Sequence, residues 1–193
     1  MAATLVEDRH PALAQVSSTD PRHPWRRALD TAALLRAAVF APVRALTLAA
    51  RERALSGSAR AGRHDPDPLA LRHALRVHCV LAAAAAAGQA PTRADAGRYV
   101  REQRSTAVLL GAEPDDLPGT LAEVGADVAR VRAGLRPAGP LLVPADGLGD
   151  DWARTSVLAL ALLPSWARPV PSPISREELA TGLRGLGEDP PRR

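Results

Sequence analysis

The side chains best suited to chemistry in this chain are its five histidines, His10, His23, His64, His73 and His78. No two of them stand four residues apart, so no helix presents the pair of imidazoles that a two-histidine metal site needs. His73 and His78 are five positions apart, which separates them by roughly 140° around a helix. One regular helix therefore cannot aim both imidazoles at a single metal ion.

A lone histidine on an apolar helix has two common explanations. It is either a core residue with satisfied nitrogens or an axial ligand to a haem, which requires only one or two protein donors. Spacing alone favours the core explanation. Phosphate-binding loops, a GxSxG nucleophile elbow and an HExxH helix are all absent from the sequence. The acid pairs Asp65 with Asp67 and Asp115 with Asp116 stand in proline-bounded loops, where capping is more frequent than acid–base catalysis.

His73 and His78 belong to residues 69–87, which we expect to form the central helix. Past Val77 this segment is apolar almost all round, so other helices should wrap it. At about 100° per residue, one side of the helix carries Arg72, Arg76 and Cys79. His78 falls on the opposite side, which it shares with Leu71, Ala74 and Leu75. His73 lies off the arginine side, near Val77 and Val80.

Proline, glycine and capping signals divide the remainder into helices. We expect them over residues 9–16, 24–40, 43–55, 92–110, 120–135 and 152–166, with a last helix after the Ser175 cap. Thr120 and Glu123 have the spacing of a capping box. No segment alternates with a period of two over strand length. The sequence therefore predicts an all-α, single-domain multi-helix bundle over residues 1–170, followed by a C-terminal helix and disordered tail over residues 171–193.

Composition limits the cellular location of the protein and the classes of partner that it can bind. The single cysteine, Cys79, excludes a disulfide framework and favours a reducing, cytoplasmic location. The net charge of +4 comes from arginines scattered along every expected helix, which indicates solvated helix faces and no nucleic-acid partner. The longest run without Asp, Glu or Arg, residues 77–92, is shorter than the roughly 20 residues of a membrane span. The acidic N-terminus does not have the pattern of a signal peptide.

Several segments, in order, resemble the haem-dependent oxygenase family of bacterial latex-clearing proteins and MpaB-type oxygenases. The resemblance is carried by LVEDRHPALAQV (residues 5–16), DPRHPWRRALDT (20–31), DPLALRHALRVH (67–78), ADAGRYVREQRSTAVLLGAEPDDLP (94–118) and LLPSWARPV (162–170). From the first to the last, these segments extend over residues 5–170, which is most of the length of the chain. The resemblance implies a globin-like helical core around haem b and oxidation of a hydrophobic, isoprenoid-like small molecule with O2.

The resemblance also implies roles for particular residues. Arg27 and Thr31 fall on the arginine and threonine of the helix that faces the distal side of the haem, where they would be catalytic and cofactor-binding residues. An arginine there holds bound oxygen or a haem propionate through charge-assisted hydrogen bonds. The two residues share one stripe of a helical wheel. The alternative is a surface pair of Arg27 with Asp30, worth only about 0.3 kcal/mol.

The chain departs from the family at two positions expected to bind iron. Asp30 replaces a lysine, and Ser56 replaces the histidine of the family's IH..V.G pattern. Serine is a poor haem ligand, so His78 is predicted as the substitute iron ligand because of its apolar side, with His73 as the second candidate. The alternative is a degenerate, non-catalytic family member that has lost the cofactor and binds an apolar ligand or a protein partner.

Overall fold

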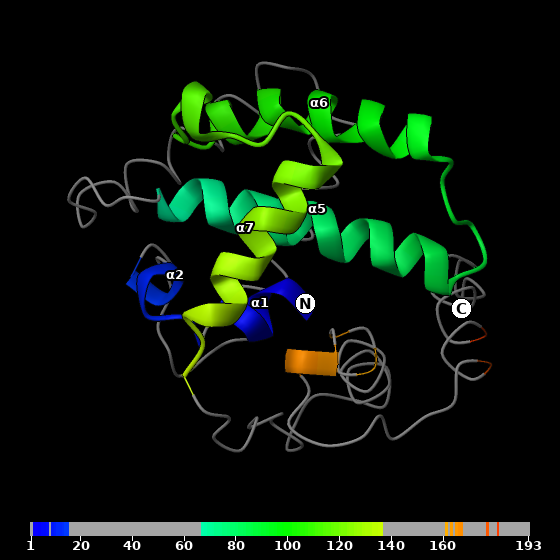
Figure 1. The fold of residues 1–193 in the computed structure, drawn as a ribbon, viewed down its shortest axis with the longest axis horizontal. Coiled ribbons are helices and arrows are strands. Elements are labelled where there is room, and N and C mark those ends of the chain that lie inside the picture. Colours follow the sequence, from blue (N-terminus) through cyan, green and yellow to red (C-terminus); the bar gives the residue numbers. More distant parts are fainter. Residues whose placement is uncertain are drawn as a thin grey trace, which may run out of the picture.

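The computed structural model describes residues 2–7, 9–15, 67–136, 161, 163, 165–167, 177 and 181. Within these residues every regular element is an α-helix or a 3-10 turn and none is a strand, which confirms the predicted all-α class. In Figure 1 the long helix α5 (Pro68–Ala86) runs through the middle, with α6 (Arg93–Leu109) beside it and α7 (Leu121–Ala133) crossing it. The short helices α1 (Ala2–Glu7) and α2 (Pro11–Gln15) also pack against α5.

The predicted central helix is confirmed nearly to the residue. The Asp67 side chain accepts a hydrogen bond from the Leu69 amide at 3.0 Å, and Pro68 occupies the first turn, where its missing amide hydrogen costs nothing. At the other end the Gly88 amide donates to Ala85 O and the Gln89 amide to Ala84 O. This is a Schellman motif, and it places Gly88 at φ +80°.

The two following helices also begin where their capping signals predict. The Thr92 hydroxyl accepts a hydrogen bond from the Asp95 amide at 3.1 Å at the start of α6. At the start of α7 the Glu123 amide donates to the Thr120 hydroxyl, and the Glu123 carboxylate accepts from the Thr120 amide. The predicted capping box is therefore present. The expected loop between these helices contains a 3-10 turn, Pro114–Asp116.

Three apolar clusters join these elements, and α5 contributes to all of them. The first packs α1, α2 and the segment around residues 163–167 onto the helices, through Ala3, Val6, Leu13, Leu71, Leu75, Val131, Leu163 and Ala167. The second joins the N-terminal end of α5 to the C-terminal end of α6, through Ala70, Ala107, Ala112 and Leu117. The third lies where α5, α6 and α7 meet, and consists of Val77, Val100, Val124 and Val128.

Two expectations need correction. The N-terminal helix expected over residues 9–16 is the shorter α2, and an unpredicted helix, α1, precedes it. The C-terminal half of α5 is not wrapped as its composition predicted, since Val80 is 38% exposed and Ala85 is also exposed. Alanine-rich segments have strong helix propensity, so this half forms a helix without a full covering of neighbours.

Other expectations fall outside the described residues. They are the helices over residues 24–40 and 43–55, and the boundary between residues 170 and 171. Of the helix expected over residues 152–166, the structure describes Ala161 as helical and Ser165–Ala167 as a 3-10 turn that includes Trp166. Of the last expected helix it describes only Glu177 and Thr181, both helical.

Candidate functional site

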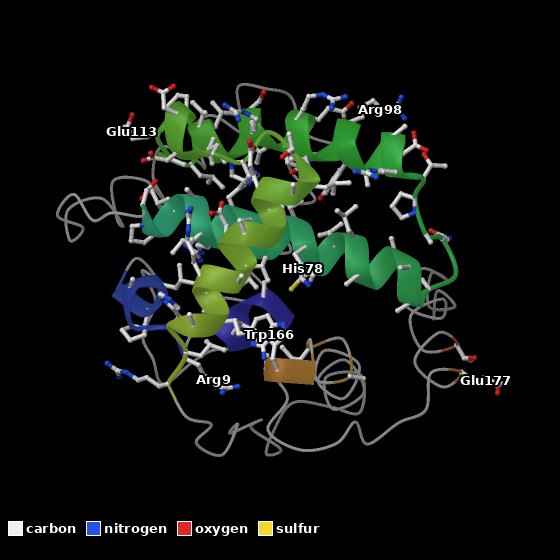
Figure 2. All side chains as sticks on the ribbon, viewed as in Figure 1. Arg9, His78, Arg98, Glu113, Trp166 and Glu177 are labelled. Carbon is white, nitrogen blue, oxygen red and sulfur yellow. The ribbon has the colours of Figure 1, made fainter. Side chains whose placement is uncertain are left out.

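Both histidines predicted as iron ligands lie on α5, on different faces. His73 lies in the N-terminal half of the helix. His78 projects from its middle (Figure 2). As their spacing predicted, the structure does not bring the two imidazoles together. Arg27 and Thr31, and the departures at Asp30 and Ser56, lie outside the described residues.

His73 has one imidazole nitrogen, Nε2, that is buried and unpaired among the described residues. Burial, together with the positive charges of Arg76 and Arg104, lowers the pKa of His73 from 6.5 to about 4. The imidazole is thus neutral near pH 7, which is the form that binds iron. A buried nitrogen without a partner costs about 1 to 3 kcal/mol, so it calls for an explanation.

His78 has different surroundings. Burial lowers its pKa as well, so it too is neutral near pH 7. The apolar side of α5 that it shares is tightly packed, because Ala74 and Leu75 are both 0% exposed. Next to it, burial raises the pKa of the Cys79 thiol to about 11. A thiol that keeps its proton at neutral pH is a weak metal ligand, so His78 is the stronger donor of the two.

The sequence did not predict the buried carboxylate that lies between α1 and α5. Glu7 of α1 is 0% exposed and accepts hydrogen bonds from Arg72 Nε at 3.0 Å and Arg76 Nε at 3.2 Å. Burial alone would raise the pKa of the Glu7 carboxyl, but the charges of Arg76 and Arg72 outweigh it and hold that pKa below 4.5. The ion triad of Glu7, Arg72 and Arg76 corrects, for these two arginines, the expectation that arginines lie on solvated faces. Two features of the sequence could have predicted this triad. They are an acid, Glu7, within an apolar segment, and two arginines, Arg72 and Arg76, one helical turn apart.

Hydrogen bonds of Arg9 connect the turn between α1 and α2 to the residues that follow α7 and to the 3-10 turn Ser165–Ala167. Arg9 donates from Nη1 to Ala167 O at 2.7 Å and from Nη2 to Arg136 O at 3.3 Å, and its own carbonyl accepts from the Arg136 amide. His10 is buried, its Nδ1 accepts from the Leu13 amide, and its ring packs so closely on Gly134 that a Cβ there would overlap it. His10 is therefore a core histidine.

Arg104 of α6 fixes the connection to α7 and also faces the α5 site. Its Nη1 donates to Leu117 O at 2.6 Å and its Nη2 to Pro114 O at 2.9 Å. Carbonyl groups are neutral, so these bonds leave the guanidinium charge in place, where it acts on His73. No local sequence signal marks Arg104, because both acceptors belong to a loop beyond the end of its helix.

The arrangement around α5 suits a group that needs a single nitrogen donor. Within the described ranges no three His, Cys, Asp or Glu side chains gather closely enough to hold a metal ion by themselves. A haem iron is held in its macrocycle and needs only one or two axial donors. His73 and His78 each provide a neutral imidazole for that purpose, so the residues present fit such a group.

The comparisons with known proteins agree with the resemblance seen in the sequence. The family model described as "ER-bound oxygenase mpaB/B'/Rubber oxygenase, catalytic domain" matches residues 1–187. No curated protein and no solved structure matches the chain. Since the match covers nearly all of the 193 residues, the chain belongs to the family of MpaB and rubber oxygenase catalytic domains.

Proposed function

We propose that this protein binds haem b through a histidine of α5 and oxidises a hydrophobic, isoprenoid-like substrate with O2. Membership of an oxygenase family supports the reaction class. The observation that carries the cofactor assignment is a pair of neutral imidazoles on α5, since burial lowers the pKa of both His73 and His78. His78, the ligand predicted from the sequence, is the second donor on the same helix.

Each residue has a defined part in this proposal. Haem iron, when bound, supplies the binding and activation of O2. The α5 imidazole donates a lone pair and stays unprotonated, because burial disfavours its charged form. The ion triad of Glu7, Arg72 and Arg76 attaches α5 to α1. Arg27 and Thr31, assigned by resemblance, would offer hydrogen bonds to bound oxygen or to a propionate.

A degenerate family member without haem is the second candidate, and the sequence gives a specific reason for it. Ser56 and Asp30 stand where the family has a histidine and a lysine. Such a protein would keep the helical fold and bind an apolar ligand or a protein partner in place of the cofactor. The partly exposed apolar side chains on the C-terminal half of α5 support this alternative.

We also propose a cytoplasmic location without a membrane span. Of the described helices, α5 alone has the length and composition to cross a bilayer, and 28% of its most apolar window is buried. However, its Arg72 and Arg76 pair with the buried Glu7 of α1, and separating these charges would be costly. Fractionation of cells that express the full chain tests the proposal, and recovery with the membrane pellet would contradict it.

An absorption spectrum of the purified full chain, before and after addition of haemin, tests the cofactor. We expect a saturable Soret band that shifts on reduction and again with carbon monoxide. A flat titration would contradict haem binding and favour the degenerate member. The loaded protein is then tested for O2 consumption with a polyisoprenoid, using free haemin in buffer as the control. A consumption rate equal to that of free haemin would contradict the oxygenase activity.

A further inference from the structure

The two short N-terminal helices and the turn between them form one unit, which we call the N-terminal strap. It is the blue part of the ribbon in Figure 1 and comprises α1, α2 and the turn residues Arg9 and His10. Glu7 pairs with two arginines of α5, and Arg9 bonds to Arg136 beyond α7. The third polar residue, His10, packs against Gly134 at the end of α7. Polar contacts therefore attach the strap to α5 and to the end of α7.

His10 occupies the N-cap position of α2. Its carbonyl accepts a hydrogen bond from the Ala14 amide at 2.9 Å, and its Nδ1 accepts from the Leu13 amide at 3.4 Å. Leu13 is the third residue of α2, so the imidazole satisfies the amide that an asparagine or serine N-cap usually satisfies. An acceptor at Nδ1 requires the neutral ring, with its one proton on Nε2.

A second proton on this ring would break the cap. The proton would occupy Nδ1, so two N–H groups would face each other where the hydrogen bond stood. α2 has only five residues, and a helix this short depends on caps and tertiary contacts. Leu13 is 0% exposed and packs in the first apolar cluster with Leu71 and Val131. Loss of the cap would therefore loosen Leu13 and uncover that cluster.

The surroundings do not offset the added charge. The charged side chains described in the strap, in the part of α5 packed against it and at the end of α7 are Glu7, Arg9, Arg72, Arg76, Asp127, Arg130, Arg132 and Arg136. Both acids among them are already paired, Glu7 with the two arginines of α5 and Asp127 with Arg130. Within this described set, a charged His10 would be surrounded by arginines and by carboxylates that already have partners.

Linkage gives the direction of the effect. The docked strap favours neutral His10, because burial lowers its pKa from 6.5. Above pH 6.5 the ring is neutral whether the strap is docked or released, so docking has its full strength. As the pH falls below 6.5, the released strap takes up a proton that the docked strap resists, and docking weakens until the lowered pKa is reached. Glu7 responds in a separate range, below pH 4.5.

We infer that His10 is an acid-sensitive switch, whose protonation releases the N-terminal strap from α5 and α7 and exposes the first apolar cluster. The inference goes beyond the proposed function and does not depend on haem.

Hydrogen exchange of the full chain tests the inference, measured by mass spectrometry at about pH 7.5 and 5.5 and corrected for the intrinsic effect of pH on exchange. The matched variant is His10→Asn, which keeps an acceptor for the Leu13 amide but cannot be protonated. Relative to this variant, the wild-type strap should lose protection several-fold at the lower pH. The limit is about 10-fold, which linkage sets for one imidazole with an ordinary pKa of 6.5.

The other histidines titrate alike in both proteins, so the comparison isolates His10. An equal pH response of the two straps would overturn the inference, because another group would then control the strap. A wild-type strap whose protection does not change with pH would also overturn it. NMR titration of the wild type needs no variant, and the Leu13 amide should there titrate with the midpoint of the His10 ring. Separate midpoints, or a Leu13 signal that does not move, would contradict the switch.

Discussion

The two halves of α5 differ in what holds them. From Pro68 to Val77 the helix is fixed by other parts of the chain, through the Glu7 ion triad and side chains such as Leu75 that are fully buried. From His78 to Ala86 it is more exposed and is closed by its own Schellman motif. One helix can therefore combine an N-terminal half that the Glu7 ion triad anchors with a C-terminal half whose apolar surface is partly exposed, and His73 lies in the anchored half.

The largest effect should come from breaking the anchor. Glu7→Gln would remove the carboxylate that Arg72 and Arg76 both contact in a largely buried place, and we expect a loss of about 3 to 5 kcal/mol of unfolding free energy. Chemical denaturation measures it. Glu102→Gln is the matched control, because its ion pair with Arg98 is 3.9 Å long and exposed, and should cost less than about 0.5 kcal/mol. Equal losses of unfolding free energy in the two variants would contradict the stabilising role of the ion triad.

Acid should weaken the same anchor. The folded-state pKa of Glu7 lies below its ordinary value of 4.5, so its stabilising contribution is fully present above pH 4.5. It is lost as the pH falls through the lowered folded-state pKa. The unfolding free energy, measured from about pH 6 to pH 3, should fall less steeply in Glu7→Gln than in the wild type. Parallel curves would contradict the assignment of this slope to Glu7.

The difference in packing can be tested with one substitution made in each half. Ala74 is 0% exposed, so Ala74→Leu should cost about 1 to 3 kcal/mol through overpacking. Ala84 is only partly buried, and Ala84→Leu should change stability by less than about 0.5 kcal/mol. Thermal melts provide the measurement. A large loss in Ala84→Leu would show that the C-terminal half is as tightly covered as the N-terminal half.

The smallest effect should come from the motif that ends the C-terminal half. Gly88 has φ +80°, a conformation that costs a residue with a Cβ about 1 to 2 kcal/mol, so Gly88→Ala should destabilise by about 1 kcal/mol. The control is Gly125→Ala inside α7, where a Cβ would meet nothing within 4 Å. It should stabilise by about 0.5 to 1 kcal/mol. Changes of the same sign in calorimetry would contradict a special role for the Gly88 backbone.

Local signals predicted the helices well where their physical causes lie within a few residues. The caps at Asp67, Thr92 and Thr120 each satisfy an amide two or three positions away, so sequence spacing alone suffices to find them. The first helix, α1, was missed because only six residues form it. Helices this short depend on tertiary contacts for their stability, and Glu7 supplies such contacts.

The candidate site was predicted only in part. The ligand role of His73 and His78 stays a prediction, whereas their placement on different faces of α5, which helical periodicity predicted, is confirmed. Their surroundings required the fold, because Arg104 and the two apolar clusters come from other elements. Arg27 and Thr31 remain predictions, since they lie outside the described residues.

By itself the sequence determined the all-α class, the extent and capping of the central helices and the family, because these depend on neighbouring residues and on motifs in order. Only the tertiary structure decided which polar groups are buried together. Glu7 meets Arg72 across 65 positions of the chain, and Arg9 meets Ala167 across 158. No local pattern specifies such pairs, because their free energy depends on the water excluded when distant segments pack.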